Sequence, residues 1–157
     1  MLTATVASEN RAALWTALTT LPISWSAVPS EGIALPGDLS LSYSDAPDGE
    51  VAHLKITLYA SESLEELLDG RGPYTEEELD DPYAVIDEYW IQARLHVDAL
   101  TVEAAGALGL PDVTGQSNWL LPDRTISLGL TQADKEEPIE VCAWLLPPGL
   151  TADRMHF

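Results

Sequence analysis

Cysteine, lysine and long apolar runs are all scarce in this chain of 157 residues. The single cysteine, Cys142, cannot close a disulfide within the chain, which excludes a disulfide-stapled scaffold. The first residues show neither a basic segment nor a long apolar run, so no secretory signal peptide is expected. No apolar run reaches the length of about 20 residues that a bilayer-spanning helix needs. We therefore expect a cytoplasmic protein that makes no contact with a membrane.

Charge of one sign dominates the composition. Seven basic residues stand against 26 acidic ones, which gives a formal net charge of −19, and the only lysines are Lys55 and Lys135. Such a field repels nucleic acid and favours a basic protein partner. A solvated surface that keeps the protein dissolved and an adaptation to high salt fit the same composition. The charge thus excludes nucleic acid as a partner and leaves these three interpretations open.

Motifs for catalysis and cofactor binding are also missing. No serine lies in a G-x-S-x-G elbow, and no loop matches G-x-G-x-x-G or G-x-x-x-x-G-K. Cys142 lies in an alternating run and is expected to be a packed strand residue. His53, His96 and Asp98 could meet on one sheet face, but no second ligand pair supports a metal site, and an ordinary polar face is the favoured interpretation. We expect a protein that is not an enzyme and has no cofactor.

The pattern of apolar residues predicts an α+β fold in a single domain spanning residues 1–157. One antiparallel or mixed sheet should carry an N-terminal helix over residues 9–20, capped by Ser8, and one or two short helices capped by Ser63 and Thr101. The predicted strands cover residues 23–28, 39–43, 51–60, 89–97, 125–131 and 139–146. An acidic insertion at about residues 71–87 should lie outside the core.

The predicted core follows from the side of each element that carries apolar residues. Alternation over residues 89–97 is the clearest in the chain and places Ile91 and Leu95 inside the sheet. The whole predicted core comprises Leu14, Leu18, Leu54, Ile56, Leu58, Ile91, Leu95, Ile126, Leu128, Val141 and Leu145.

Candidate contact residues come from the tryptophans and the acidic insertion. The chain has five tryptophans, and Trp90 falls on the polar side of a predicted strand whereas Trp119 falls in a predicted loop. Tryptophan at such places is enriched in protein interfaces. The predicted interface residues are Trp90, Trp119, Glu76, Glu77, Glu78, Asp80 and Asp81.

Three stretches resemble tail terminator and tail completion (neck) proteins of tailed viruses. These are SENRAALWTALTTL followed by PISWSAVP, the later HLKITLYA, and WIQARLHVDALTVEAAGAL. The first resembles an N-terminal helix leading into a short strand that bears tryptophan, and the last resembles a strand followed by a helix of small residues. The resemblance implies a ring-forming structural subunit of a virion, located in the virion or the host cytoplasm. Its partners would be copies of itself and neighbouring subunits of the assembly.

A second class of function fits the charge and the size. An immunity-type inhibitor, or a protein that imitates DNA, would use an acidic surface to cap a basic partner. The sequence leaves both classes open, and both act through protein–protein contact.

Overall fold

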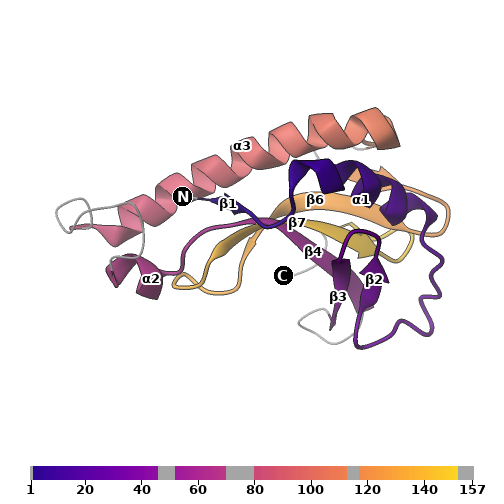
Figure 1. The fold of residues 1–157 in the computed structure, drawn as a ribbon, viewed down its shortest axis with the longest axis horizontal. Helices are drawn as coiled ribbons and strands as arrows, with labels where there is room; N and C mark the ends of the chain where they lie inside the picture. The colour runs from indigo at the N-terminus through magenta and orange to yellow at the C-terminus, as the bar shows by residue number, and fades with distance from the viewer. Residues whose placement is uncertain (1, 46–51, 70–79, 113–116, 152–157) are drawn as a thin grey trace.

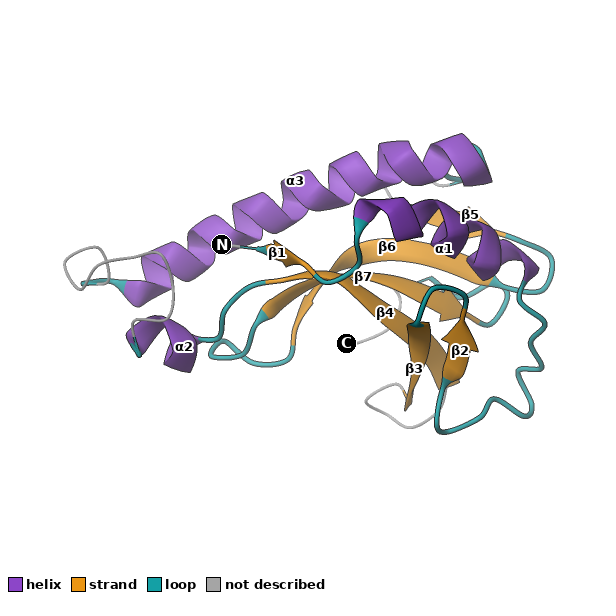
Figure 2. Cartoon of the chain, viewed as in Figure 1, coloured by secondary structure: helices purple, strands orange, loops and turns teal. Residues whose placement is uncertain are grey.

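The computed structural model describes residues 2–45, 52–69, 80–112 and 117–151 (Figure 1). The strands form one antiparallel sheet, and α1 and α3 lie together on one side of it (Figures 1 and 2). This arrangement confirms the predicted α+β class. In chain order the elements are β1 (Thr3–Ala4), α1 (Ser8–Thr20), β2 (Ile33–Leu35), β3 (Leu39–Asp45), β4 (Ala52–Ala60), α2 (Leu64–Leu68), α3 (Pro82–Leu108), β5 (Asn118–Leu120), β6 (Thr125–Gln132) and β7 (Ile139–Leu146).

The sheet has seven strands in the order β2-β3-β4-β7-β6-β5, and β1 pairs with the end of β4. Its centre is the pair of β4 and β7, where Ile56 lies opposite Ala143. The predicted strands at residues 39–43, 51–60, 125–131 and 139–146 are confirmed within the described residues. Residues 46–51, which connect β3 and β4, lie outside the described residues.

Helix α1 begins one residue earlier than predicted. Ala7 is the N-cap residue and makes no side-chain capping bond, whereas Ser8, the expected cap, is the first helical residue. Leu14, Trp15 and Leu18 face the core. The short helix α2 is capped as predicted, since the Oγ of Ser63 accepts a hydrogen bond of 3.2 Å from the backbone N–H of Glu66.

The segment after α1 is not a strand. Residues 23–28 were expected to form one, but they turn back on themselves, with the N–H of Ala27 donating to the carbonyl of Ser24 at 3.0 Å. Trp25 leaves this turn to donate its Nε1–H to the carbonyl of Asp123 at 2.9 Å. A local turn and a side-chain anchor thus replace the expected pairing with a neighbouring strand.

The largest error of the sequence analysis concerns residues 89–97, which belong to the 27-residue helix α3 and not to a strand. Asp81 caps this helix, with its Oδ1 accepting from the N–H of Ala84 at 3.3 Å, and Pro82 occupies the first turn. Thr101 was expected to start a separate helix, but it lies inside α3, where its hydroxyl donates to the carbonyl of Val97 at 2.7 Å.

The helical period decides which residues of α3 are buried. Tyr89, Ala93, Leu100 and Ala104 recur at intervals of four, seven and four residues, and all four are buried. Ile91 and Leu95, both expected in the core, lie on the opposite side and are 61% and 65% exposed. The other nine predicted core residues are buried: Leu14, Leu18, Leu54, Ile56, Leu58, Ile126, Leu128, Val141 and Leu145.

The predicted acidic insertion, residues 71–87, lies only partly within the described residues. Most of residues 71–87, including Glu76, Glu77 and Glu78, lie outside the described residues. From Pro82 onward the chain is already helical, and Val85 and Ile86 are buried in the core. This end of the segment therefore belongs to the packed domain, contrary to the prediction.

Candidate contact surface

Helix α3 presents a row of apolar side chains to solvent. Ile91, Leu95 and Val102 are 61%, 65% and 77% exposed, and Ala99 between them is exposed too. Intervals of four, four and three residues bring these four side chains to one side of a helix. We call them the apolar row. Because the opposite side of α3 is buried in the core, the apolar row points away from the sheet.

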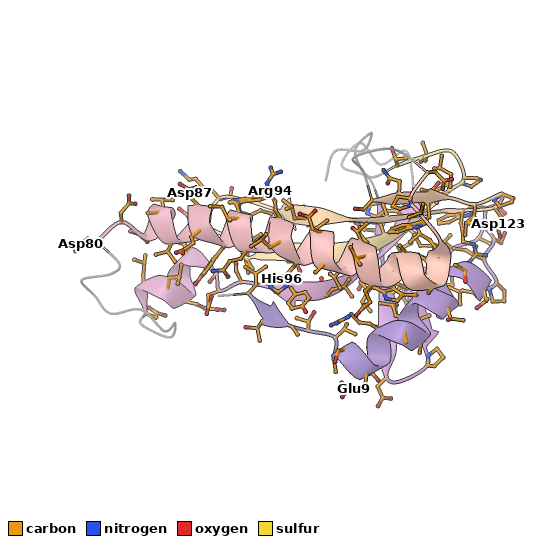
Figure 3. All side chains as sticks on the ribbon, turned by 90° about the horizontal axis from the view of Figure 1, so that it is seen from above. Glu9, Asp80, Asp87, Arg94, His96 and Asp123 are labelled. Atoms are coloured by element: carbon orange, nitrogen blue, oxygen red, sulfur yellow. The ribbon has the colours of Figure 1, made fainter. Side chains whose placement is uncertain are left out.

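Charged groups flank the apolar row. Figure 3 shows Asp87 and Arg94 along one side of α3 and His96 on the other side, towards α1 and β1. Arg94 is the single basic residue of this helix unless His96 is protonated. It makes no hydrogen bond or ion pair within the part of the chain that the structure describes. A guanidinium that has no partner among the described residues therefore lies beside the apolar row.

The two candidate tryptophans have different environments. Trp90 lies on α3 and is partly buried, with one side packed against the core. Trp119 does not lie in a loop as expected but in β5, where it is 2% exposed. Its Nε1–H donates to the carbonyl of Gly109 at 2.8 Å and so holds the end of α3. Of the two, only Trp90 offers part of its ring to a partner.

The acidic candidates that the structure describes are Asp80 and Asp81. Both are exposed, and Asp81 caps α3. They lie at the helix end remote from Val102, next to Glu76, Glu77 and Glu78 in the sequence. The structure thus places two of the five acidic candidates at the tip of the surface that carries the apolar row.

On its other side, α3 is joined to α1 by a polar cluster. Arg11 donates from Nε and Nη2 to the two carboxylate oxygens of Glu103, at 2.8 and 2.9 Å, and Trp15 Nε1 donates to the same carboxylate at 3.0 Å. His96 stacks on the ring of Tyr59, with ring centroids 3.9 Å apart. The pKa of His96 is lowered by burial and by the charge of Arg11. These contacts fix the orientation of α3, and no sequence motif indicated them.

The Arg11–Glu103 pair predicts a dependence of stability on pH. The hydrogen bond from Arg11 lowers the pKa of Glu103, against the opposing effect of burial, and the bond from Trp15 adds to the lowering. A lowered folded-state pKa stabilises the fold above the ordinary glutamate pKa of about 4.3, and this contribution disappears as pH falls through the lowered value. We expect Glu103→Gln to lose less stability than the wild type between about pH 5 and pH 3. Urea midpoints measured across this range test it, and parallel profiles would contradict it.

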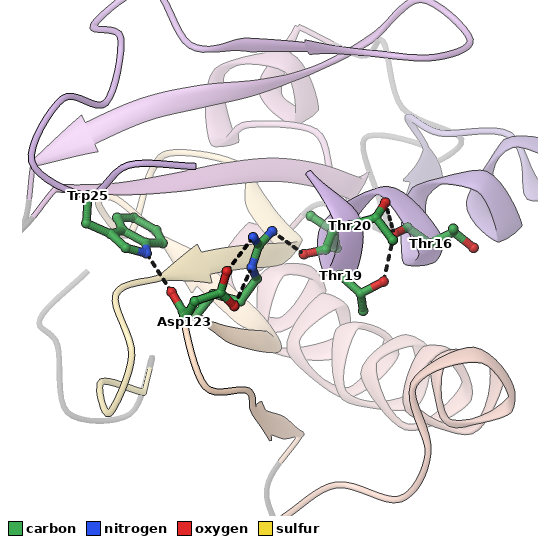
Figure 4. Close-up of polar contacts among 7 residues, drawn as sticks. Thr16, Thr19, Thr20, Trp25 and Asp123 are labelled. Atoms are coloured by element: carbon green, nitrogen blue, oxygen red, sulfur yellow. Dashed lines mark hydrogen bonds and ion pairs between the residues drawn. The ribbon is translucent and has the colours of Figure 1, made fainter. Parts of the chain in front are cut away.

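A second polar cluster lies at the C-terminal end of α1 (Figure 4). The buried Arg124 donates to the carbonyl of Leu18 at 3.2 Å and makes two bonds to Asp123, at 3.1 and 2.8 Å. Trp25 donates to the backbone of the same aspartate. The carbonyl of Thr16 accepts from Thr19 and Thr20. These contacts hold the C-terminal end of α1 against the loop that contains Asp123 and Arg124.

The residues considered for chemistry do not come together. His53 is buried on β4, His96 stacks on Tyr59, and Asp98 is exposed on α3, so the shared polar sheet face expected for them does not exist. Among the described residues, no three His, Cys, Asp or Glu side chains are grouped as metal ligands. Cys142 is buried in β7, as predicted, and burial raises the pKa of its thiol to about 12.

Comparison of the chain with protein-family models, with curated proteins and with solved structures finds no match. Within the described ranges, none of the helices combines the length and the apolar character needed to cross a bilayer.

Proposed function

We propose that this chain is a structural subunit of a virion neck or tail assembly and acts through protein–protein contacts. The observation that carries the proposal is the apolar row on α3. A chain with a net charge of −19 exposes Ile91, Leu95 and Val102 side by side on its longest helix. Contiguous exposed apolar groups of this kind mark sites of protein interaction.

The kind of assembly follows from the sequence resemblance to tail terminator and tail completion proteins. In support of this class, residues 8–20 of the first stretch form helix α1, and HLKITLYA forms most of β4. PISWSAVP, the second part of the first stretch, forms no strand, and WIQARLHVDALTVEAAGAL lies in one continuous helix. The proposal therefore takes its assembly class from α1 and β4 and its contact surface from α3.

Native mass spectrometry across a salt series tests this function. An assembly subunit that associates through apolar contact should form oligomers whose fraction stays constant or rises with salt, because apolar burial is insensitive to screening and repulsion between acidic copies is reduced. Oligomers of the wild type at moderate salt are the expected result. A chain that stays monomeric at every salt concentration, and joins no other virion component, would contradict the proposal.

The acidic inhibitor remains a second candidate because of the net charge of −19. Exposed acids at the start of α3, namely Asp80, Asp81, Asp87 and Glu88, would face a basic partner. Binding to such a partner should weaken steeply as salt rises, opposite to the behaviour expected of self-assembly. The same salt series therefore separates the two functions.

A further inference from the structure

Part of the outer side of β6 has no paired strand among the described residues. At the β2 edge the strand has three residues and Pro36 follows it. The β5 edge is also three residues long, and Asp112 covers it by accepting from the N–H of Leu120 at 2.6 Å and donating to the carbonyl of Asn118 at 2.9 Å. The C-terminal end of β4, at Tyr59 and Ala60, is paired with β1. Strand β6, by contrast, pairs with β5 only over Thr125–Ser127, and no described strand pairs with its outer side beyond Leu128.

The backbone groups on this open edge can be identified. The N–H of Leu128 donates outward to the carbonyl of Ser117 at 2.9 Å. Successive residues of a strand point their N–H and C=O groups to opposite sides, and β6 pairs with β7 without a register shift as far as Gln132. The N–H and C=O groups of Leu130 and Gln132 therefore also point outward. We call residues 129–132 the open edge.

Natural sheets protect such an edge with proline, a bulge, an inward-pointing charge or a covering segment. The open edge reads Gly-Leu-Thr-Gln and has neither a proline nor a charge. Its pairing with β7 shows no bulge, and nothing in the described ranges covers it. Among the described residues, the open edge is therefore available to a second strand.

Helix α3 runs along the open edge. At one end its Thr101 hydroxyl lies 2.6 Å from the hydroxyl of Ser117, beside Leu128. At the other end the Nζ of Lys135, just past β6, lies 6.0 Å from the ring centroid of Tyr83. The helix packs on both β6 and β7. Its flank that carries Asp87 and Arg94 faces the same direction as the open edge, because His96 on the other flank faces Tyr59 of β4 (Figure 3).

We propose that the open edge and this flank of α3 form the contact between two copies of the chain, related by a two-fold axis. The inference rests on the proposed function and names the self-contact through which the subunit assembles. The two β6 strands would pair antiparallel through Leu130 and Gln132 and join two sheets into one. Each α3 would then lie beside its partner on the same side of the joined sheet.

The expected distance between the two α3 helices agrees with this arrangement. Strands lie about 4.8 Å apart, so a helix above the line between β6 and β7 lies about 5 Å from a two-fold axis at the open edge. Two such helices are then about 10 Å apart, within the usual range for packed helices. Pairing of the strands therefore also brings α3 of one copy into contact with α3 of the other.

A second copy fits this surface better than a foreign strand. An isolated strand would satisfy the open edge but leave in water the exposed part of Trp90, which lies on the same flank of α3 as Arg94. A partner with a helix on the same side of its sheet covers both the open edge and the flank of α3. A second copy of this chain is such a partner. Arg94 would also lie at a contact between two acidic helices, where its unpaired charge reduces their repulsion.

The size of the contact fits a weak dimer. Residues 83–102 of α3 span about 30 Å at a rise of 1.5 Å per residue, and the open edge spans about 13 Å at about 3.3 Å per residue. With each layer about 10 Å deep, this gives roughly 400 Å² from each copy, the size of a weak, transient contact. We therefore expect a concentration-dependent dimer that tightens with salt.

Sedimentation equilibrium of the full chain, with Gln132→Pro and Gln132→Ala as a matched pair, tests the proposal. Both variants lose the side-chain bonds from Gln132 Nε2 to the carbonyls of Lys135 and Glu137. Only proline removes the outward N–H, which does not take part in pairing with β7. We expect Gln132→Pro to raise the dimer dissociation constant about tenfold or more and Gln132→Ala to leave it near the wild-type value.

Arg94→Glu tests the helix layer without changing the strand. It places an acid on the flank of α3 that faces the partner and should raise the dimer dissociation constant, whereas the double variant Ile91→Glu with Leu95→Glu, whose exposed side chains point away from the sheet, should change it little. Equal dissociation constants for the proline and alanine variants, together with an unchanged Arg94→Glu variant, would overturn the proposal. A wild type that forms oligomers by another surface gives that same result while the proposed function stands, so the two ideas fail separately.

Discussion

Replacing Ile56 by alanine is expected to lower the free energy of unfolding by about 2–5 kcal/mol. Ile56 lies in the middle of β4, opposite Ala143 of β7, and is 7% exposed. It belongs to the main core cluster, which includes Leu54 and Leu58 of the same strand and residues of α1 and α3. Truncation leaves a cavity that these elements cannot fill without moving. Urea denaturation gives the free energy directly.

Ile91→Ala is the matched control for this measurement. The same side chain is removed, but Ile91 is 61% exposed on α3, so the change in the single chain should stay within about 0.5 kcal/mol. The protein must be dilute enough to be monomeric, because self-association would change the measured free energy of unfolding. A large loss of unfolding free energy for Ile91→Ala with a small loss for Ile56→Ala would mean that Ile91 is buried and Ile56 is exposed, the opposite of the structure.

The strands were predictable where the apolar residues follow a single periodicity. Leu54, Ile56 and Leu58 alternate with polar residues in β4, and no competing helical pattern includes them. Residues 89–97 satisfy two patterns at once, since the alternation that includes Ile91 and Leu95 coexists with the helical spacing of Tyr89, Ala93 and Leu100. A window limited to nine residues favours a strand. The absence of proline and glycine from residues 83–105 is the signal that predicts one long helix.

The contact surface was predictable only in part. Trp90 was a candidate from its residue type, and it is partly exposed on α3. The apolar row was mistaken for core, because solvent-exposed isoleucine and leucine cannot be distinguished from buried ones by sequence pattern when the type of element is wrong. The open edge depends on where β5 stops pairing with β6, which is a tertiary property that no local pattern shows.

Replacing Gly32 by alanine should be the most damaging change outside the core. Gly32 has a φ of +85°, and an added Cβ would lie 2.2 Å from the carbonyl oxygen of Leu41. This oxygen belongs to the backbone of β3, opposite Ile33 of β2, so no side-chain rotation can relieve the overlap. The left-handed conformation costs about 1–2 kcal/mol and the overlap about 1–3 kcal/mol, so a loss of about 2–5 kcal/mol is expected.

Gly149→Ala separates these two effects. Gly149 has nearly the same φ, +84°, but an added Cβ meets no atom within 4 Å. The loss of unfolding free energy for Gly149→Ala should therefore contain only the conformational cost of about 1–2 kcal/mol. Urea denaturation of both variants gives the difference, which measures how firmly β2 is held against β3. Equal losses in the two variants would mean that the β2–β3 hairpin moves away from Gly32 at little cost, and that Leu35 and Leu41 contribute less to the core than their burial indicates.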